Sequence, residues 1–307
     1  MTDTRTTDAG ATKAGLSDAA DWRSGKGHRD ENFPVASWLI AARHRPAILA
    51  FYNFVRTADD IADHPAMPAR QKLALLDRLD AGLAGGNDDD AVAMRLREVL
   101  AARGLSHQHA RDLLAAFKLD VTKLRYGDWD DLISYCSLSA MPVGRFVLDV
   151  HGESRDTWPA NDALCAALQI INHLQDCKSD YQTLDRVYVP LDALAASGAE
   201  LADLGGARAT PALRDCLHGL AARTERLLSL SDVFADTIED TRLGLEVAVI
   251  NTLAHQLTRL LMQRDPLSEN VHLSKPAVAG LTLLAILRES SRRLRRQRAA
   301  AHKPRGA

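Results

Sequence analysis

Cysteine is scarce in this 307-residue sequence, and the histidines do not have the spacing of a zinc site. The cysteines are scattered without a C-x-x-C pair, at Cys136, Cys165, Cys177 and Cys216. No basic segment followed by an apolar core opens the chain, so no secretory signal is expected. We therefore expect the protein to be cytoplasmic.

Long hydrophobic runs are also lacking. The longest candidate, PAVAGLTLLAIL, extends for about a dozen residues, whereas a helix that crosses a bilayer needs roughly 18 to 20. The formal net charge is -2, which provides no overall attraction to nucleic acid. We therefore expect neither a membrane-spanning segment nor a nucleic-acid partner.

Alternation of apolar and polar residues, which is typical of strands, is rare, and from Glu31 onward the chain is rich in Ala, Leu and Arg at helical spacing. The sequence therefore predicts an all-α protein. Because it shows no repeat of about 20 to 50 residues and no shift in composition, we expect one helical domain over 31–290, between a disordered polar leader, 1–30, and a basic tail, 291–307. The expected helices span Pro46–Asp63, Pro68–Leu83, Ala91–Ala102, His107–Leu124, Trp129–Val150 with a kink at Pro142, Pro159–Tyr181, Pro211–Phe234, Arg242–Gln263 and Pro276–Arg296.

The stretch RTADDIADHP places three aspartates close together near the end of the first expected helix. On a helix, Tyr52, Arg56, Asp59, Asp60 and Asp63 fall at i, i+4, i+7, i+8 and i+11, which is one continuous polar stripe. Like charges at this spacing repel one another, so the stripe needs either open water or a cation. For an isolated cluster, a solvated helix face explains the pattern equally well.

A second polar stripe favours the cation. In QIINHLQDCKSDY, the residues Gln169, Asn172, Asp176 and Asp180 fall at i, i+3, i+7 and i+11, and the neighbouring His173 points off this stripe and is interpreted as structural. Mg²⁺ prefers oxygen ligands and typically takes one or two carboxylates together with phosphate oxygens and water. Two facing acidic helices would hold several Mg²⁺ ions with a diphosphate between them.

With these motifs the sequence resembles the squalene/phytoene synthase family, the head-to-head trans-isoprenyl diphosphate synthases. The resemblance covers the chain from about Glu31 to Leu294 and rests on FYNFVRTADDIAD, YCSLSAMPVG, NHLQDCKSDY and RVYVP. The opening ENFPVASWLI, the ending ADDIADHP and NHLQDC are most similar to the hydroxysqualene synthase branch of bacterial hopanoid pathways. It implies an isoprenoid-synthase-type helical bundle around an apolar cavity, with the two acidic motifs facing each other at its mouth.

The resemblance also implies roles for individual residues. It assigns Mg²⁺ binding to Asp59, Asp60, Asp63, Asn172, Asp176 and Asp180. It assigns catalytic roles beside the diphosphate and the reacting centre to Tyr52, Arg56 and Tyr135. Binding of the diphosphate substrate is expected from Arg56, Gln169 and Asn172, and from Lys178 and Arg186 as nearby cations, although a surface position is the commoner one for an arginine such as Arg186.

The second motif departs from the family at two positions. Related synthases commonly carry an arginine where this chain has Gln175 and a glutamate where it has Ser179. This favours an enzyme that takes a single diphosphate. The expected reaction is Mg²⁺-dependent conversion of presqualene diphosphate to hydroxysqualene with release of diphosphate; the alternatives are condensation of two prenyl diphosphates and a non-catalytic helical module that binds Mg²⁺ or a membrane surface.

The C-terminal tail is strongly basic. Its cations are Arg292, Arg293, Arg295, Arg296, Arg298, Lys303 and Arg305. A solvated helix end accounts for them, because cations suit a helix C-terminus. The alternative is peripheral contact with the inner face of the membrane, where a water-insoluble product could pass to other enzymes of a hopanoid pathway.

Overall fold

The computed structural model describes residues 40–301, so the expected leader 1–30, the opening motif through residue 39, Lys303 and Arg305 lie outside the described residues. The α-helices are α1 (Arg45–Asp63), α2 (Ala69–Ala84), α3 (Ala91–Arg103), α4 (Gln108–Thr122), α5 (Trp129–Ser139), α6 (Met141–His151), α7 (Trp158–Leu184), α8 (Leu191–Ser197), α9 (Pro211–Ser229), α10 (Phe234–Thr237), α11 (Thr241–Leu261) and α12 (Lys275–Ala301). Within 40–301 no strand forms, and the prediction of an all-α protein is confirmed. No helix in that range is long and apolar enough to cross a membrane.

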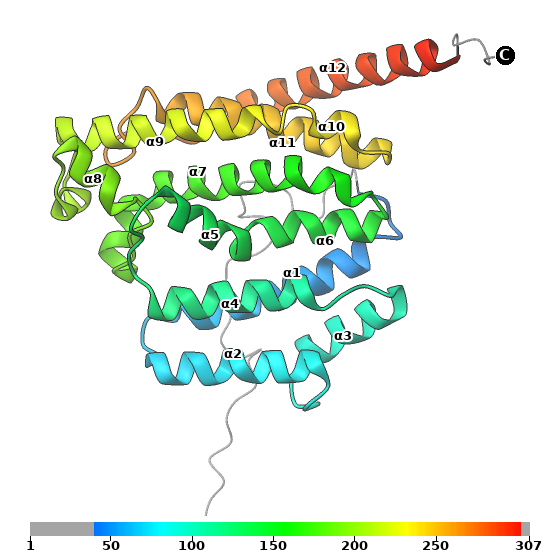
Figure 1. The fold of residues 1–307 in the computed structure, drawn as a ribbon, viewed down its shortest axis with the longest axis horizontal. Helices are drawn as coiled ribbons and strands as arrows, with labels where there is room; N and C mark the ends of the chain where they lie inside the picture. Colours follow the sequence, from blue (N-terminus) through cyan, green and yellow to red (C-terminus); the bar gives the residue numbers. More distant parts are fainter. Residues whose placement is uncertain (1–39, 302–307) are drawn as a thin grey trace, which may run out of the picture.

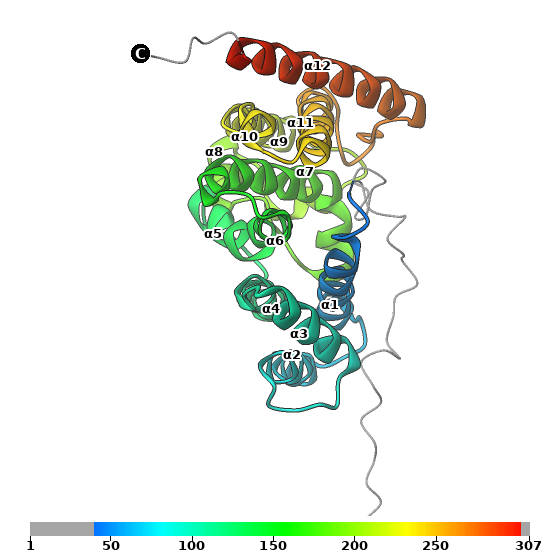
Figure 2. The same ribbon diagram turned by 90° about the vertical axis from the view of Figure 1, so that its right-hand side faces the viewer.

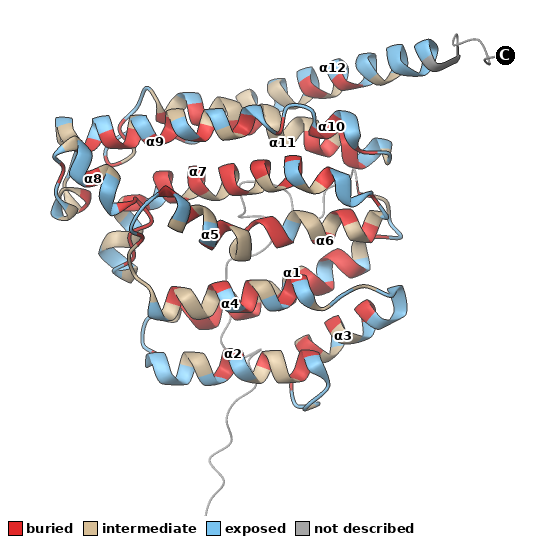
Figure 3. Ribbon diagram, viewed as in Figure 1, coloured by how far each residue is buried: buried red, intermediate tan, exposed pale blue. Residues whose placement is uncertain are grey.

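The helices are stacked in layers from the bottom to the top of Figures 1 and 2. The helices α2 and α3 form one end, followed by α1 and α4, then α5 to α7, then α9 to α11, and α12 forms the other end. Two groups of buried apolar side chains fill the layers. The smaller one lies among α1 to α4 and includes Phe146 and Val150 of α6. The larger one joins α4 and α5 to α11. Figure 3 shows the buried residues on the inward sides of the helices.

Helix ends follow local capping chemistry. The Asp90 side chain accepts hydrogen bonds from the backbone N–H groups of Val92 and Ala93 at the start of α3, and Asp240 caps α11 in the same way. The short α8 begins after Pro190 and was not predicted, because its seven residues are too few to display a periodic pattern. The predicted helix Pro211–Phe234 was too long, since α9 ends at Ser229 and a turn leads into α10.

The expected helix Trp129–Val150 is two helices, which corrects the sequence prediction. The break lies at Ala140, where α5 ends and α6 begins. Pro142 has no N–H to donate to the preceding turn, so the α-helical ladder cannot continue through it. After the break, α6 lies very close to α7. A Cβ atom added to Gly144 would lie only 1.9 Å from Asn161 Oδ1.

We expect Gly144→Ala to lower the free energy of unfolding by about 1 to 3 kcal/mol, because the added methyl group overlaps α7 at Asn161 and Cys165. The matched control is Gly219→Ala in α9, where nothing lies within 4 Å of the added Cβ and the exposed helical position should gain about 0.5 to 1 kcal/mol. Urea denaturation of both variants measures the difference. Equal stability of the two variants would contradict the close approach of α6 and α7.

Candidate active site

A cavity of about 600 Å³ lies between the layers and is lined by residues from α1, α4, α5, α6, α7 and α11. One part of its wall is polar and contains both acidic motifs. The rest is mostly apolar, although Asn161 and Glu246 also line it. Its apolar residues include Ile48, Phe51, Val55, Leu113, Phe117, Phe146, Val147, Leu164, Leu168, Val247 and Ile250. Such a cavity suits a molecule with one highly charged end and a long hydrocarbon part.

The helix α1 contributes Tyr52, Arg56, Asp59 and Asp63 to the cavity wall. The expected ligand Asp60 does not line the cavity; it is buried and accepts a hydrogen bond of 2.8 Å from Arg56. Arg56 also donates to Asp59 at 2.8 Å, so one guanidinium group joins two successive carboxylates. The acidic stripe of α1 is therefore divided between the cavity and the interior.

The helix α7 contributes the whole of its predicted stripe to the same cavity, with Gln169, Asn172, Asp176 and Asp180 in its wall. Asp176 is exposed, whereas Asp180 is half-buried. The tertiary structure thus brings together two acidic motifs that are far apart in the sequence. All the groups that they offer are oxygen donors, which is the donor set that hard cations such as Mg²⁺ prefer.

Arg186 is buried, in contrast to the surface position that is common for arginine. Its Nη1 atom donates to Asp63 at 2.5 Å, and its Nη2 atom donates to the carbonyl oxygen of Ala62 at 3.2 Å. Its Nε atom donates to the carbonyl oxygen of Asp120 at 3.0 Å. Arg186 therefore joins the end of α1 to α4 and holds one of the cavity carboxylates in place.

Asp120 is a cavity residue that the sequence reasoning missed. Its carboxylate is buried and accepts hydrogen bonds from the hydroxyl groups of Tyr135, at 3.0 Å, and Tyr188, at 2.8 Å. Burial raises its pKa to about 6, although Arg186 and both hydroxyl groups oppose this rise. A signal was present in the sequence, because Asp120 is in helical register with the apolar residue Leu113 on the buried side of α4.

His173, which was interpreted as structural, lies in the cavity wall. Its ring stacks on Tyr188 with the centroids 3.5 Å apart, and its Nε2 atom is 3.0 Å from the side-chain nitrogen of Gln169. Burial, assisted by the charge of Arg186, lowers the pKa of His173 to about 3, so the imidazole is neutral at physiological pH. With Tyr135 it forms an aromatic wall beside the polar part of the cavity.

Lys178 is not brought to the cavity with the other expected substrate-binding residues. Its Nζ atom lies 3.4 Å from the carbonyl oxygen of Leu267. Gln175, one of the departures from the family motif, is buried and donates to the carbonyl oxygen of Val271 at 3.0 Å. Both side chains therefore contact the segment between α11 and α12, on a different side of α7 from the acidic stripe.

The carboxyl groups of the cavity have strongly perturbed acidities. Burial, and next the charge of Asp63, raises the pKa of Asp59 to about 7, although Arg56 opposes this rise. Burial and the neighbouring Asp176 raise the pKa of Asp180 to about 7. Burial and the neighbouring carboxylates both disfavour the ionised forms, and a divalent cation would relieve the crowded negative charge, so the residues present fit Mg²⁺.

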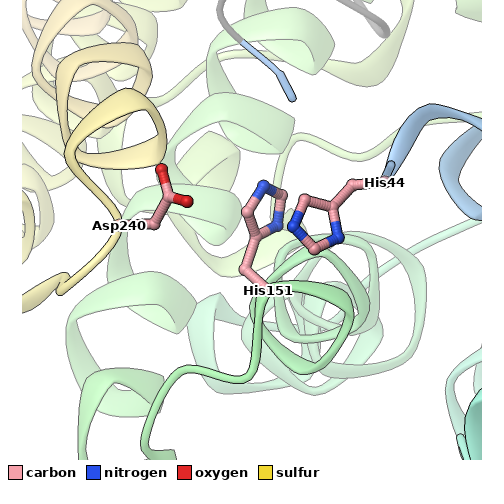
Figure 4. A group of neighbouring side chains, drawn as sticks. All are labelled: His44, His151 and Asp240. Carbon is pink, nitrogen blue, oxygen red and sulfur yellow. The ribbon is translucent and has the colours of Figure 1, made fainter. Parts of the chain in front are cut away.

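A third polar cluster, of His44, His151 and Asp240, lies where α1, α6 and α11 approach one another (Figure 4). The ring atoms Nε2 and Nδ1 of His44 lie 2.8 Å from Arg43 Nε and 3.5 Å from Arg103 Nη1. Two guanidinium groups at its nitrogens oppose a metal ion. We therefore interpret this cluster as a polar contact between helices.

Comparisons with known proteins agree with this geometry. The sequence matches the squalene/phytoene synthase family model over residues 27–277. It is 60% identical to the hydroxysqualene synthase of Rhodopseudomonas palustris over 258 residues. This alignment covers 84% of this chain and 88% of that protein. Among solved structures, it is similar to squalene synthase HpnC from Alicyclobacillus acidocaldarius, with 30% identity, a TM-score of 0.67 and coverage of 78% of this chain and 90% of that one.

A more distant structure shows the same fold. The crystal structure of a dehydrosqualene synthase in complex with ligand is 22% identical and has a TM-score of 0.74, with coverage of 89% of this chain and 96% of that chain. The expectation of an isoprenoid-synthase-type helical bundle is confirmed by these likenesses.

We expect Mg²⁺ to raise the melting temperature by several degrees more at about pH 8 than at about pH 5. The folded-state pKa values of Asp59 and Asp180 lie above the ordinary carboxyl value, so protonation of these groups favours the folded state at low pH. This contribution to the free energy of unfolding is lost as the pH rises through about 7. Above that pH the ionised carboxylates repel one another and can bind a cation. Below it protons compete with Mg²⁺ for the carboxylate oxygens. Thermal unfolding with Mg²⁺ or EDTA measures the effect.

The variant Asp180→Asn should reduce the Mg²⁺-induced shift of the melting temperature at about pH 8. The matched control, Asp185→Asn, should leave this shift unchanged, because Asp185 pairs with Arg125 and neither residue lines the cavity. An equal shift at both pH values would contradict cation binding by these carboxylates.

Proposed function

Because the chain belongs to the squalene/phytoene synthase family, whose members act on isoprenoid diphosphates, we propose that this enzyme converts presqualene diphosphate to hydroxysqualene and diphosphate in a squalene or hopanoid pathway. The observation that carries the proposal is the 60% identity to the hydroxysqualene synthase of Rhodopseudomonas palustris over most of both chains. The cavity supports it, since an apolar body adjoins a wall with two acidic motifs.

The diphosphate would bind at the polar part of the cavity together with Mg²⁺ held by Asp59, Asp63, Asn172, Asp176 and Asp180. When bound, the metal neutralises the charge that develops on the leaving diphosphate. Asp60 is not included among these ligands, because its side chain faces the interior.

The arginine content of the cavity supports a substrate with one diphosphate. Among the described residues, the arginines in the cavity wall are Arg56 and Arg186, and both already donate to carboxylates. The second motif adds no cation, since Lys178 contacts Leu267 instead. A site that bound two diphosphates would need more positive charge than these residues supply.

The hydrocarbon part of the substrate would lie against the aromatic and aliphatic wall. Breaking the C–O bond leaves a cyclopropylcarbinyl cation, which rearranges while diphosphate departs with the bonding electrons. The faces of Tyr135 and Tyr188 provide electron-rich surfaces there, each worth about 0.5 to 2 kcal/mol to a nearby cation, and the neutral ring of His173 adds no positive charge to this wall. Water then forms the new C–O bond, and the proton that it loses is taken up by the released diphosphate.

Product analysis with labelled water tests the proposal. We expect the purified protein to consume presqualene diphosphate, release diphosphate and incorporate one ¹⁸O atom from labelled water into a C30 alcohol, because water ends the reaction. Mass spectrometry detects the label. Efficient turnover of farnesyl diphosphate alone, with little use of presqualene diphosphate, would instead favour the condensing reaction.

Substitution of single aspartates tests the two motifs. We expect Asp59→Asn and Asp176→Asn to lower kcat by about a hundredfold or more, since each removes a charged oxygen ligand from the cavity wall while keeping its size. Steady-state assays at saturating Mg²⁺ measure the loss, with circular dichroism as the test of folding.

The comparison variant is Asp60→Asn, whose loss should be less than about tenfold because Arg56 keeps its partner Asp59. A folded Asp60→Asn variant as inactive as Asp59→Asn would show that Asp60 is itself required at the metal site.

A further inference from the structure

The outer face of α12, which we define as Leu283, Leu284, Leu287 and Leu294, is an apolar stripe exposed on the surface. These side chains are 60%, 39%, 57% and 49% exposed. In the described part of the chain, nine large hydrophobic side chains are exposed, and four of them lie on this one helix. Single exposed leucines are ordinary, but an apolar stripe of this kind marks an interaction site.

The opposite side of α12 is fixed to the body of the protein, so rotation of the helix cannot bury the stripe. Glu289 is 2% exposed and accepts hydrogen bonds from Arg293, at 2.8 Å, and Arg296, at 3.0 Å. Arg293 also donates to the carbonyl oxygens of Ala235 and Ile238. Two of the tail arginines are therefore structural contacts between α12 and the α10 region.

The charged side chains on the exposed side of α12 are all positive. Glu289 is the one acidic residue of the helix, and it faces inward. Arg288 and Arg295 are exposed and lie about 100° around the helix from Leu283, Leu287 and Leu294, which places them beside Leu284. Arg298 is exposed close to the line of the other three leucines. Leucines bordered by arginines, without an acidic side chain, are the pattern of a helix that lies in a membrane interface.

We propose that the outer face of α12 docks the protein onto an anionic lipid bilayer, with the helix lying along the membrane surface. The leucines would enter the boundary between headgroups and acyl chains, and the arginines would contact the anionic headgroups. The position of α12 supports this, since it forms one end of the stack of helices and lies on α11 with its other side turned outward (Figures 2 and 3). The complementary charge favours lipid over a second copy of this chain, whose α12 would present the same arginines.

Vesicle flotation with the full-length protein tests the docking surface. We expect binding to vesicles of equal parts phosphatidylcholine and phosphatidylglycerol, and weak binding to phosphatidylcholine alone. The triple variant Leu283→Ser/Leu287→Ser/Leu294→Ser should weaken partitioning about tenfold or more, because it removes the apolar contact. The double variant Arg288→Gln/Arg295→Gln should weaken partitioning onto the anionic vesicles about fivefold for each arginine removed. Added salt should reduce the difference in partitioning between this variant and the unchanged protein.

Matched controls separate the surface from general effects. Leu191→Ser changes an exposed leucine on α8, and Arg70→Gln/Arg95→Gln makes the same change of charge on α2 and α3, at the other end of the stack. Both should bind vesicles like the unchanged protein. Every variant should retain its activity on detergent-dispersed substrate, because none of these residues lines the cavity.

Three results would overturn the proposal. The first is an absence of binding to the anionic vesicles by the unchanged protein. The second is an equal loss of binding in the α12 variants and the control variants. The third is a stable dimer, seen by sedimentation without lipid, that the triple leucine variant dissociates; this would make the outer face of α12 an interface between copies. Since the vesicle-binding and sedimentation readouts do not require turnover of presqualene diphosphate, failure of the proposed reaction would leave them intact.

Discussion

Electrostatic repulsion among the carboxylates of α1 and α7 is the constraint on which the site depends, because both helices direct acidic stripes into one cavity. Burial and mutual repulsion raise the pKa values of Asp59 and Asp180 to about 7. Two arginines offset part of this cost: Arg56 spans Asp59 and Asp60, and Arg186 holds Asp63. The compensation is incomplete, and in the proposed function the remaining negative charge is what Mg²⁺ would neutralise when a diphosphate binds.

The apolar part of the cavity depends on a different feature, the break between α5 and α6. Because Pro142 interrupts the ladder at that point, α6 can approach α7 until Gly144 meets Asn161, while α5 carries Tyr135 toward Asp120. Asn161 donates to the carbonyl oxygen of Met141 at 3.3 Å, which is a direct contact between α7 and the start of α6. A straight helix could not place both the tyrosine and the close contact in the same wall.

Helical periodicity was sufficient to find most of the candidate site, because a stripe at i, i+4 and i+7 is a local property of the chain. It could not decide which side of α1 faces the cavity, and so it grouped Asp60 with Asp59 although the two point about 100° apart. Lys178 was expected to bind substrate as a cation next to the second motif in the sequence, but its side chain contacts Leu267 on another side of α7. Asp120 was missed since its partners Tyr135 and Tyr188 come from other parts of the chain.

The sequence by itself determined the helical class, the two acidic stripes and the likeness to a family, because each depends on residue type and short spacing. The tertiary structure alone decided that Arg186 is buried between α1 and α4, that His173 forms part of the cavity wall, and that α12 turns its leucines outward. These placements follow from contacts between helices that are distant in the sequence. Periodicity within one helix shows which residues share a face, and only packing against other helices shows what that face meets.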